Sequence, residues 1–290
     1  MKPSSFRYAA PSSLREAIDI RARSEDSVIL AGGQSLIPTM NFRLANPDVV
    51  IDLRRIAELD YIRVTDGLVR IGAMTRQRAV EENAEAAAAN PLIRETLRNV
   101  AHPAIRNRGT IGGSLAHADP SAELPTLLTT LRGVLTAQGP SGRRSIPASE
   151  FFEFIFTTSL APDELLIEAA VPVLEPGEGW AFSEFARRHG DYAVAGVAVT
   201  LRIGGDGLIS HARLGACGIS TVPTPLTACE ELLIGEAPSA ELFARAGAAA
   251  RDAVTVSDDS ATSKAYRQHV LAGLVEANLK TAMTRVGSTR

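Results

Sequence analysis

Residues 106–120 read Arg-Asn-Arg-Gly-Thr-Ile-Gly-Gly-Ser-Leu-Ala-His-Ala-Asp-Pro, and residues 31–36 repeat the pattern more briefly as Ala-Gly-Gly-Gln-Ser-Leu. Glycine tolerates positive φ and lets the backbone approach a ligand, so the N–H groups of such a run can converge on an anion. Either run alone is more often an ordinary turn. Two in one chain, each beside an apolar anchor (Leu30 or Ile111), predict opposing walls around one diphosphate.

The composition narrows the class of protein. With 290 residues, the chain is long enough for about two domains. Its net charge of −3 argues against a general nucleic-acid binder, which carries a basic face or stripe. Attraction for an anion must therefore be local, and Arg106 and Arg108 beside the second glycine run could supply it.

The cysteine content bears on redox cofactors and on compartment. The chain has two cysteines, Cys217 and Cys229, whereas a thiolate-ligated iron–sulfur cluster takes four ligands. They indicate reduced core thiols in a reducing compartment. The N-terminus has no apolar signal-peptide segment, and no stretch approaches the ~18 apolar residues of a membrane span. We therefore expect a soluble, cytoplasmic protein.

The N-terminal block alternates helix and strand. Residues 13–16 fit a capping box, and apolar residues follow at helical spacing as far as residue 22. Short apolar runs at 28–30 and 49–53 predict strands, and the first leads directly into the first glycine run. Open α/β structures bind phosphates at such strand ends. However, the chain has neither the Rossmann G-x-G-x-x-G turn here nor a P-loop anywhere, so both nucleotide-binding classes are disfavoured.

The second block predicts a mixed sheet covered by helices. Runs 61–64 and 68–71 around Asp66-Gly67 are typical of a hairpin, and runs 133–137 and 165–171 predict further strands. Helices are expected after Asn90-Pro91 and from Pro120, which makes the second glycine run a connection between elements.

A third block follows a boundary. The proline- and glycine-rich segment 171–179 predicts a change of domain. Beyond it, strands are expected at 192–201 and 208–215, with a glycine-rich turn between them, and helices at about 239–254 and 263–284. This block is predicted to be a small antiparallel sheet with a helical layer.

Candidate catalytic and metal-binding sets fail on spacing. Ser114 lacks the second glycine of a nucleophile elbow, and His117 and Asp119 are too close in sequence to imply a triad. His102, His117 and Asp119 match no zincin spacing, and a turn capped by Asp119 is the simpler interpretation. The sequence therefore indicates no catalytic residue and no metal ligand.

Two further residues favour a dinucleotide. Glu123 could accept hydrogen bonds from a ribose hydroxyl, although a solvated helix residue explains it equally well. Tyr192 could cover a flat ring, although a tyrosine opening a strand is as often half-buried packing. Donors for phosphate next to acceptors for sugar suit an adenine dinucleotide, but the residues alone do not say which one.

Four segments, in this order, closely resemble the FAD-binding medium subunit of bacterial molybdenum hydroxylases, the xanthine dehydrogenase and carbon monoxide dehydrogenase family. They are residues 31–38, 102–114, 119–125 and 187–193, and the resemblance extends over nearly the whole chain to residues 263–267. It implies an α+β fold. Residues 1–175 would form a two-subdomain FAD-binding domain of the vanillyl-alcohol-oxidase (PCMH) type, divided at about residue 57. Residues 176–290 would form a C-terminal domain with a small antiparallel sheet and helices.

The same resemblance assigns the residues that bind FAD. Those carried over to the diphosphate are Ile29, Leu30, Ala31, Gly32, Gly33, Gln34, Ser35, Leu36, Thr110, Ile111, Gly112, Gly113 and Ser114, with Ala101 alongside. Glu123 would face the adenosine side, and Tyr192 would lie by the isoalloxazine. Leu166 and residues 182–185 are weaker matches. Some relatives carry His in place of Gln34 and Asn in place of Ser114, and both exchanges keep a polar side chain.

The function implied by the resemblance is electron relay. A large partner subunit would hydroxylate a substrate at a molybdopterin-bound molybdenum centre, and a small partner with two [2Fe–2S] clusters would pass the electrons on. The FAD of this chain would deliver them to NAD⁺, oxygen or another acceptor. The flavin carries the redox chemistry, and the protein binds, orients and tunes it. The implied assembly is a dimer of heterotrimers, and the organic substrate is left open.

Two alternatives stay open at this point. A stand-alone flavin-dependent alcohol oxidase of the same fold would need a substrate pocket with a base beside the flavin, and activity from one polypeptide. A non-flavin scaffold subunit, whose glycine runs are only turns, would be a colourless protein.

Overall fold

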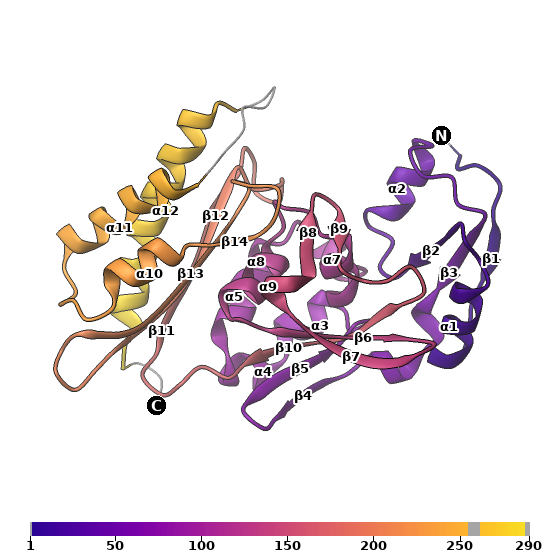
Figure 1. The fold of residues 1–290 in the computed structure, drawn as a ribbon, viewed down its shortest axis with the longest axis horizontal. Coiled ribbons are helices and arrows are strands. Elements are labelled where there is room, and N and C mark those ends of the chain that lie inside the picture. Colours follow the sequence, from indigo (N-terminus) through magenta and orange to yellow (C-terminus); the bar gives the residue numbers. More distant parts are fainter. Residues whose placement is uncertain (1, 255–261, 288–290) are drawn as a thin grey trace.

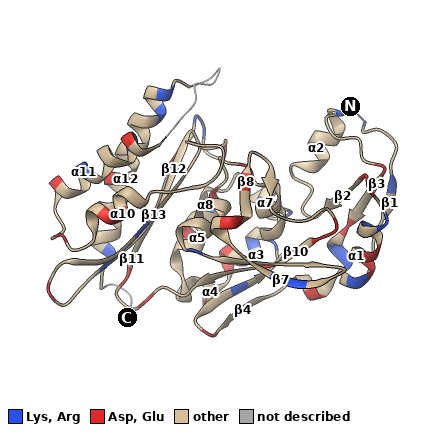
Figure 2. Ribbon diagram, in the orientation of Figure 1, with Lys and Arg blue, Asp and Glu red and all other residues tan. Residues whose placement is uncertain are grey.

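The computed structural model describes residues 2–254 and 262–287, whose elements form three units along the molecule (Figure 1). A small parallel sheet lies near the N-terminus, a larger antiparallel sheet in the middle, and a second antiparallel sheet with helices at the other end. Lys and Arg are mixed with Asp and Glu along the whole ribbon (Figure 2). Within the two described ranges, no helix combines the length and apolar character needed to cross a membrane.

The N-terminal unit is a parallel sheet in the order β1-β3-β2. Its elements are β1 (Arg7–Ala9), α1 (Leu14–Ala22), β2 (Ser27–Leu30), α2 (Leu36–Asn41), β3 (Val49–Asp52), and the short 3-10 helices η1 (Leu53–Arg55) and η2 (Ala57–Leu59). The Ser13 hydroxyl accepts a hydrogen bond from the Glu16 amide at 3.2 Å, as an N-cap does. The predicted start of the first helix is confirmed.

The middle unit is a sheet in the order β4-β5-β10-β6-β7. Its strands are β4 (Ile62–Thr65), β5 (Leu68–Gly72), β6 (Val134–Gly139), β7 (Gly142–Pro147) and β10 (Leu165–Pro172). Asp66 and Gly67 join β4 to β5 with φ of 54° and 72°, the positive values that a two-residue I′ turn requires. The predicted hairpin is confirmed.

Helices pack on this middle sheet. They are α3 (Gln77–Glu82), α4 (Ala84–Ala89), α5 (Pro91–Asn99), α6 (Pro103–Arg106), α7 (Ile111–His117), α8 (Glu123–Thr130) and α9 (Ala148–Phe151), followed by a hairpin of β8 (Phe152–Phe154) and β9 (Thr157–Thr158). Leu97 of α5, Leu115 of α7 and Leu128 of α8 share one buried core with Leu135 of β6. This core fixes the helices that carry the second glycine run.

The C-terminal unit is an antiparallel sheet in the order β11-β12-β13-β14. Its elements are β11 (Gly179–Phe185), β12 (Ala195–Ile203), β13 (Ile209–Cys217), β14 (Thr224–Pro225), α10 (Thr227–Leu233), α11 (Ala240–Ala253) and α12 (Lys264–Arg285). Side chains alternate between its faces. Val197 and Val199 pack into one core with residues of α11 and α12, whereas Phe182 and Ala198 join the core of the middle unit. The sheet therefore lies between its own helices and the middle unit.

The second glycine run is not the connection that the sequence predicts. Residues 111–117 form α7 itself, because Thr110 caps its first turn and Gly112 packs directly on Ala73. Packing here outweighs the low helix propensity of glycine. The helix expected from Pro120 begins later, at Glu123.

Candidate functional site

The first glycine run forms a tight turn between β2 and α2. Gly33 has a φ of 72°, in the left-handed region that glycine occupies without strain. The side chain of Gln34 closes the turn, with Nε2 donating to the Gly32 carbonyl at 3.0 Å. The Gly33 carbonyl in turn accepts from the Ile37 amide at 3.3 Å, which joins the turn to α2. Residues 31–36 are all half-buried, so the turn is open to solvent on one side.

The backbone amides of this turn remain available. Within the described ranges, the N–H groups of residues 32–35 have no hydrogen-bond acceptor in the chain. Unpartnered N–H groups of consecutive residues are the donors of an anion nest. The turn therefore keeps the donors that the expected diphosphate site needs.

The second glycine run is built differently, because its amides are already used. The Thr110 hydroxyl accepts from the Gly113 amide at 3.1 Å, and the Thr110 carbonyl accepts from the Ser114 amide at 3.2 Å. The Gly112 amide donates to the Ala73 carbonyl at 2.9 Å. This run therefore offers a rigid capped helix start rather than a second set of free amides.

The two glycine runs are in direct contact, although they are far apart in the sequence. A Cβ added at Gly32 would lie 2.6 Å from the Arg108 carbonyl oxygen and 2.7 Å from the Gly109 Cα. A Cβ added at Gly113 would lie 3.2 Å from the Ala31 Cβ. The glycines are therefore required so that the free amides of the first turn can lie against the start of α7.

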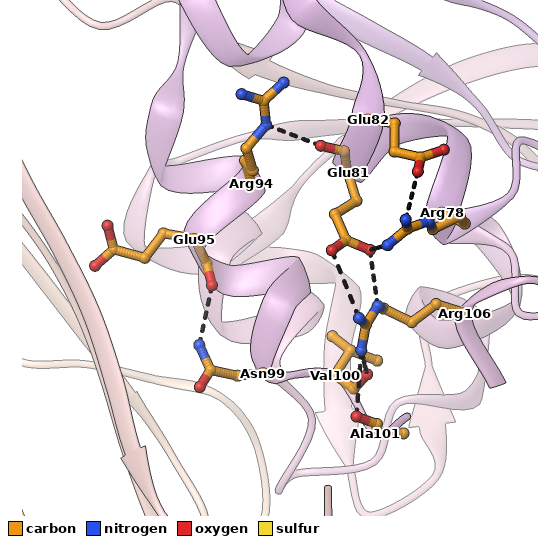
Figure 3. Close-up of polar contacts among 9 residues, drawn as sticks. All are labelled: Arg78, Glu81, Glu82, Arg94, Glu95, Asn99, Val100, Ala101 and Arg106. Carbon is orange, nitrogen blue, oxygen red and sulfur yellow. Dashed lines mark hydrogen bonds and ion pairs between the residues drawn. The ribbon is translucent and has the colours of Figure 1, made fainter. Parts of the chain in front are cut away.

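Ala101 is held in an uncommon backbone conformation by a buried ion pair. Its φ is 44°, and its carbonyl accepts from Arg106 Nη1 at 3.2 Å, next to the Val100 carbonyl at 2.8 Å. Arg106 Nε is 2.8 Å from Glu81 Oε2 (Figure 3). Arg106 is 5% exposed and Glu81 is 7% exposed. The guanidinium therefore fixes the chain that leads into α6.

This geometry corrects the suggestion that Arg106 attracts an anionic ligand. Its donors face Glu81 and two backbone carbonyls, so its charge is compensated inside the fold. Arg108 is exposed, and its carbonyl accepts from Arg76 Nη1. The sequence placed both arginines beside the glycine run correctly, but it could not show that one of them points into the protein.

The remaining predicted site residues converge on the first turn from two other segments. Tyr192, just before β12, is 66% exposed, and its phenol lies near enough to Ser35 for that residue to affect its pKa. Glu123, the first residue of α8, is 8% exposed. Asp119 lies between α7 and α8, where its Oδ1 accepts from the Ser121 amide at 2.9 Å. The structure thus brings the first glycine turn, the α7–α8 connection and the Tyr192 loop together.

Their titration reflects this convergence. Burial raises the pKa of Glu123 to about 7, the Asp119 carboxylate adds to the rise, and Arg106 opposes it. Loss of hydration raises the pKa of Tyr192, with a further contribution from Asp119, while the nearby Ser35 opposes the rise. Glu123 therefore changes charge near neutral pH, where an ordinary glutamate stays ionised.

A close contact between Gly190 and His102 positions the Tyr192 loop. Gly190 has a φ of 86°, and a Cβ there would lie 2.5 Å from His102 Cε1. The His102 ring also lies 6.2 Å, centroid to centroid, from the ring of His189. The only sequence signal was the glycine between His189 and Tyr192, which alone is no more than a turn residue.

The apolar residues among the predicted site residues pack into or against the hydrophobic cores next to the site. Ile29 packs against the core of the N-terminal unit, and a Cβ added at Gly33 would lie 3.1 Å from Leu30 Cδ1. Leu166 is buried in β10, the strand on which α7 packs. Ile111 is buried in the same core. These four side chains hold the two glycine runs in place.

The residues present fit an adenine dinucleotide such as FAD. The first turn offers free amides for phosphate oxygens, and the glycines opposite leave room for its backbone. The Glu123 carboxyl suits a sugar hydroxyl, and the exposed ring of Tyr192 suits a flat heterocycle. Across the described ranges, no cluster of His, Cys, Asp and Glu has the arrangement of a metal site.

Residues 4–174 match the family described as the FAD binding domain in molybdopterin dehydrogenase, and residues 180–282 match the CO dehydrogenase flavoprotein C-terminal domain. The chain belongs to the FAD-binding medium subunits of the molybdenum hydroxylases. It is therefore an oxidoreductase subunit with an FAD-binding domain, and the resemblance seen in the sequence is confirmed. The predicted fold, with its C-terminal antiparallel sheet, is confirmed as well.

Similar medium subunits serve several substrates. The chain is 39% identical to the 6-hydroxypseudooxynicotine dehydrogenase complex subunit alpha of Paenarthrobacter nicotinovorans, over 100% of this chain and 98% of that subunit. It is 37% identical to the caffeine dehydrogenase subunit beta of a Pseudomonas species, over 99% and 97% of the two chains. A solved carbon monoxide dehydrogenase from Hydrogenophaga pseudoflava superposes with a TM-score of 0.95 at 36% identity, covering 99% of this chain and 100% of that chain.

Proposed function

We propose that this subunit holds FAD between the first glycine turn, the start of α7 and Tyr192. The observation that carries the proposal is the set of free amides at residues 32–35, seated against the glycines of residues 109–113. The residues proposed to bind are Ile29, Leu30, Ala31, Gly32, Gly33, Gln34, Ser35, Leu36, Ala101, Thr110, Ile111, Gly112, Gly113, Ser114, Glu123, Leu166 and Tyr192. Glu123 serves the adenosine side and Tyr192 the isoalloxazine.

The bound FAD supplies the redox chemistry, taking electrons from [2Fe–2S] clusters of a small partner subunit and passing them to NAD⁺, oxygen or another acceptor. The protein binds and orients it, with no side chain acting as acid or base on a substrate. The substrate is hydroxylated at the molybdopterin cofactor of a large partner subunit. The named relatives act on substrates as different as caffeine and carbon monoxide. Substrate choice on this proposal therefore belongs to the large subunit.

Exposed apolar side chains near the site support assembly with these partners. Phe154 and Phe156 of the β8–β9 hairpin are 56% and 57% exposed, and Phe156 stacks on His117 at the end of α7. Phe42 and Leu44, just after α2, are 65% and 80% exposed. Large apolar side chains exposed on successive positions of one segment suit a protein interaction site. The assembly proposed is a dimer of heterotrimers.

The proposal also covers the domain boundaries and the cellular compartment of the chain. We place the FAD-binding domain at 1–175, with subdomains of about 1–57 and 58–175, and the C-terminal domain at 176–290. The first subdomain then holds the β1-β3-β2 sheet, and the second holds the five-stranded middle sheet with the β8–β9 hairpin. The boundary to the C-terminal domain falls between β10 and β11. Cys217 and Cys229 are buried free thiols, which suits the reducing cytoplasm.

The test of this function is a binding titration of the full-length chain with FAD and with FMN. We expect equimolar FAD binding, and FMN affinity at least about 100-fold lower, because FMN lacks the second phosphate and the adenosine. Equal affinities would remove the role of the free amides. Absence of any flavin binding would favour the scaffold alternative.

Tyr192→Ala is expected to weaken FAD binding about tenfold, because an aromatic contact contributes about 1 kcal/mol or slightly more. Tyr192→Phe keeps the ring and loses only the hydroxyl group near Ser35, so its Kd should stay within about threefold of the wild type. Quenching of flavin fluorescence measures both values. Equal losses in the two variants would show that the hydroxyl, rather than the ring, is the contact.

A further inference from the structure

Glu184 lies on the face of the C-terminal sheet that meets α8. Glu184 pairs with Gly196 across β11 and β12, and Gly196 pairs with Cys217 across β12 and β13. A Cβ added at Gly196 would lie 2.7 Å from Cys217 Sγ and 3.1 Å from Glu184 Cβ. These three residues therefore share one face, and the glycine between them leaves room for both neighbours.

The same face receives α8. Thr126 of that helix lies near enough to the Cys217 thiol to affect its pKa, and a Cβ added at Gly215 would lie 2.2 Å from Thr130 Oγ1. Glu123 stands one turn before Thr126, so it faces the sheet as well. Burial is the main cause of the raised pKa of the Cys217 thiol, and the negative charges of Glu123 and Glu184 raise it further.

Among the residues that the structure describes, no ion pair joins Glu123 or Glu184 to a Lys or Arg side chain. Within the described ranges, Glu184 Oε2 is buried without a hydrogen-bond partner. Arg106 acts on Glu123, but its donors are committed to Glu81 and to backbone carbonyls. Glu95 of α5, the other carboxylate beside β11, is already paired with Arg285 at 2.6 Å.

We infer that Glu123 and Glu184 form a carboxylic acid pair that keeps a proton at neutral pH, and that loss of this proton weakens cofactor binding. The second half of the inference rests on the proposed function, in which Glu123 faces the adenosine side. The titratable and charged groups around Glu123 and Glu184 are Asp119, Tyr192, Cys217 and Arg106, the last of which is already paired with Glu81.

The physical reason is that two neighbouring carboxylates without a paired cation cannot both ionise cheaply where one is buried and the other half-buried. Burial raises the pKa of Glu184 to about 8, and the Glu123 carboxylate adds to that rise. The pKa of Glu123 is raised to about 7. At neutral pH the pair therefore holds about one proton, and at higher pH it gains a second negative charge next to the site for an anionic cofactor.

The free energy of unfolding of the chain should depend on pH through the same two carboxyl groups. Both carboxyls are raised above their unfolded pKa, so the unfolded chain releases these protons first as the pH rises. Their contribution to stability is complete below about pH 4.5 and is lost as the pH rises through about 7 and 8. An ordinary ionised glutamate would make no such contribution over this range.

Infrared difference spectroscopy of the full-length chain without flavin tests the proton directly. Between about pH 6 and pH 9.5, the wild type should lose a C=O band of protonated carboxylic acid. Glu184→Gln removes one of the two acids that titrate in this range, so about half of that change should disappear. Glu164→Gln is the matched control, because Arg144 lowers the pKa of Glu164 and keeps it ionised. Should Glu184→Gln not fold, Glu123→Gln replaces it in the same assay.

The FAD titration tests the link to binding. Over the same pH range, the Kd of the wild type should rise about tenfold, whereas that of Glu184→Gln should rise less than about threefold. A C=O band unchanged by Glu184→Gln overturns the shared proton. Equal pH dependence of the Kd in both chains overturns the link. Failure to bind FAD at any pH refutes the proposed function instead, because the infrared result needs no flavin.

Discussion

Gly32→Val is expected to abolish stable retention of flavin by the full-length chain. A Cβ at residue 32 would lie 2.6 Å from the Arg108 carbonyl oxygen and 2.7 Å from the Gly109 Cα. Both are backbone atoms, so neither can rotate away, and the first turn must separate from the start of α7. We expect the Kd for FAD to rise at least about 100-fold, which corresponds to about 2.8 kcal/mol.

Gly205→Val is the matched control for this substitution. Gly205 lies in the turn between β12 and β13, where no atom lies within 4 Å of an added Cβ. Its flavin affinity should equal that of the wild type in the same fluorescence titration. If Gly32→Val also bound FAD with wild-type affinity, the close seating of the two glycine runs would not be what forms the site.

Arg106→Ala is expected to lower the free energy of unfolding by about 3 kcal/mol. The substitution leaves the buried Glu81 carboxylate without its main partner, and it removes the donor to the carbonyls of Val100 and Ala101 (Figure 3). Arg78, whose Nη1 is 3.2 Å from Glu81 Oε2, would still compensate part of the Glu81 charge. The expected loss of stability is therefore at the lower end of the range for a broken buried ion pair. Urea denaturation followed by circular dichroism measures it.

Arg78→Ala is the comparison within the same network. Its side chain is 38% exposed, and it pairs with Glu82 as well as with Glu81. A partly exposed ion pair of this kind contributes less than about 1 kcal/mol. Similar losses for the two variants would contradict a structural role specific to Arg106.

The elements with strong local signals were predicted from the sequence. The Ser13 cap, the Asp66-Gly67 turn and the apolar run of β10 each specify their structure within a few residues. The second glycine run was predicted as a connection because helices were expected on either side of it. Its helical structure in α7 depends on the distant contact between Gly112 and Ala73. β11 was not predicted either, since its pairing with β12 and its packing on α5 are tertiary.

The site was predicted only in part from the sequence, because some of its features depend on contacts between distant segments. Two glycine runs indicated converging backbones, and the structure brings them together. Sequence spacing gave no means of telling that the amides of one run are free and those of the other are used. Nor did it show that Arg106 points inward or that Glu184 meets Glu123, because each depends on how separate units pack.

The most direct test of the relay is a visible absorption spectrum of this chain, purified through a tag from its native cell with all co-purifying subunits retained. We predict flavin bands overlaid on broad iron–sulfur absorbance, together with a large and a small partner. The two cysteines of this chain cannot supply those clusters, so the second signal must come from a partner. A single polypeptide with flavin bands and turnover would indicate a stand-alone oxidase. A colourless single polypeptide would contradict the account altogether.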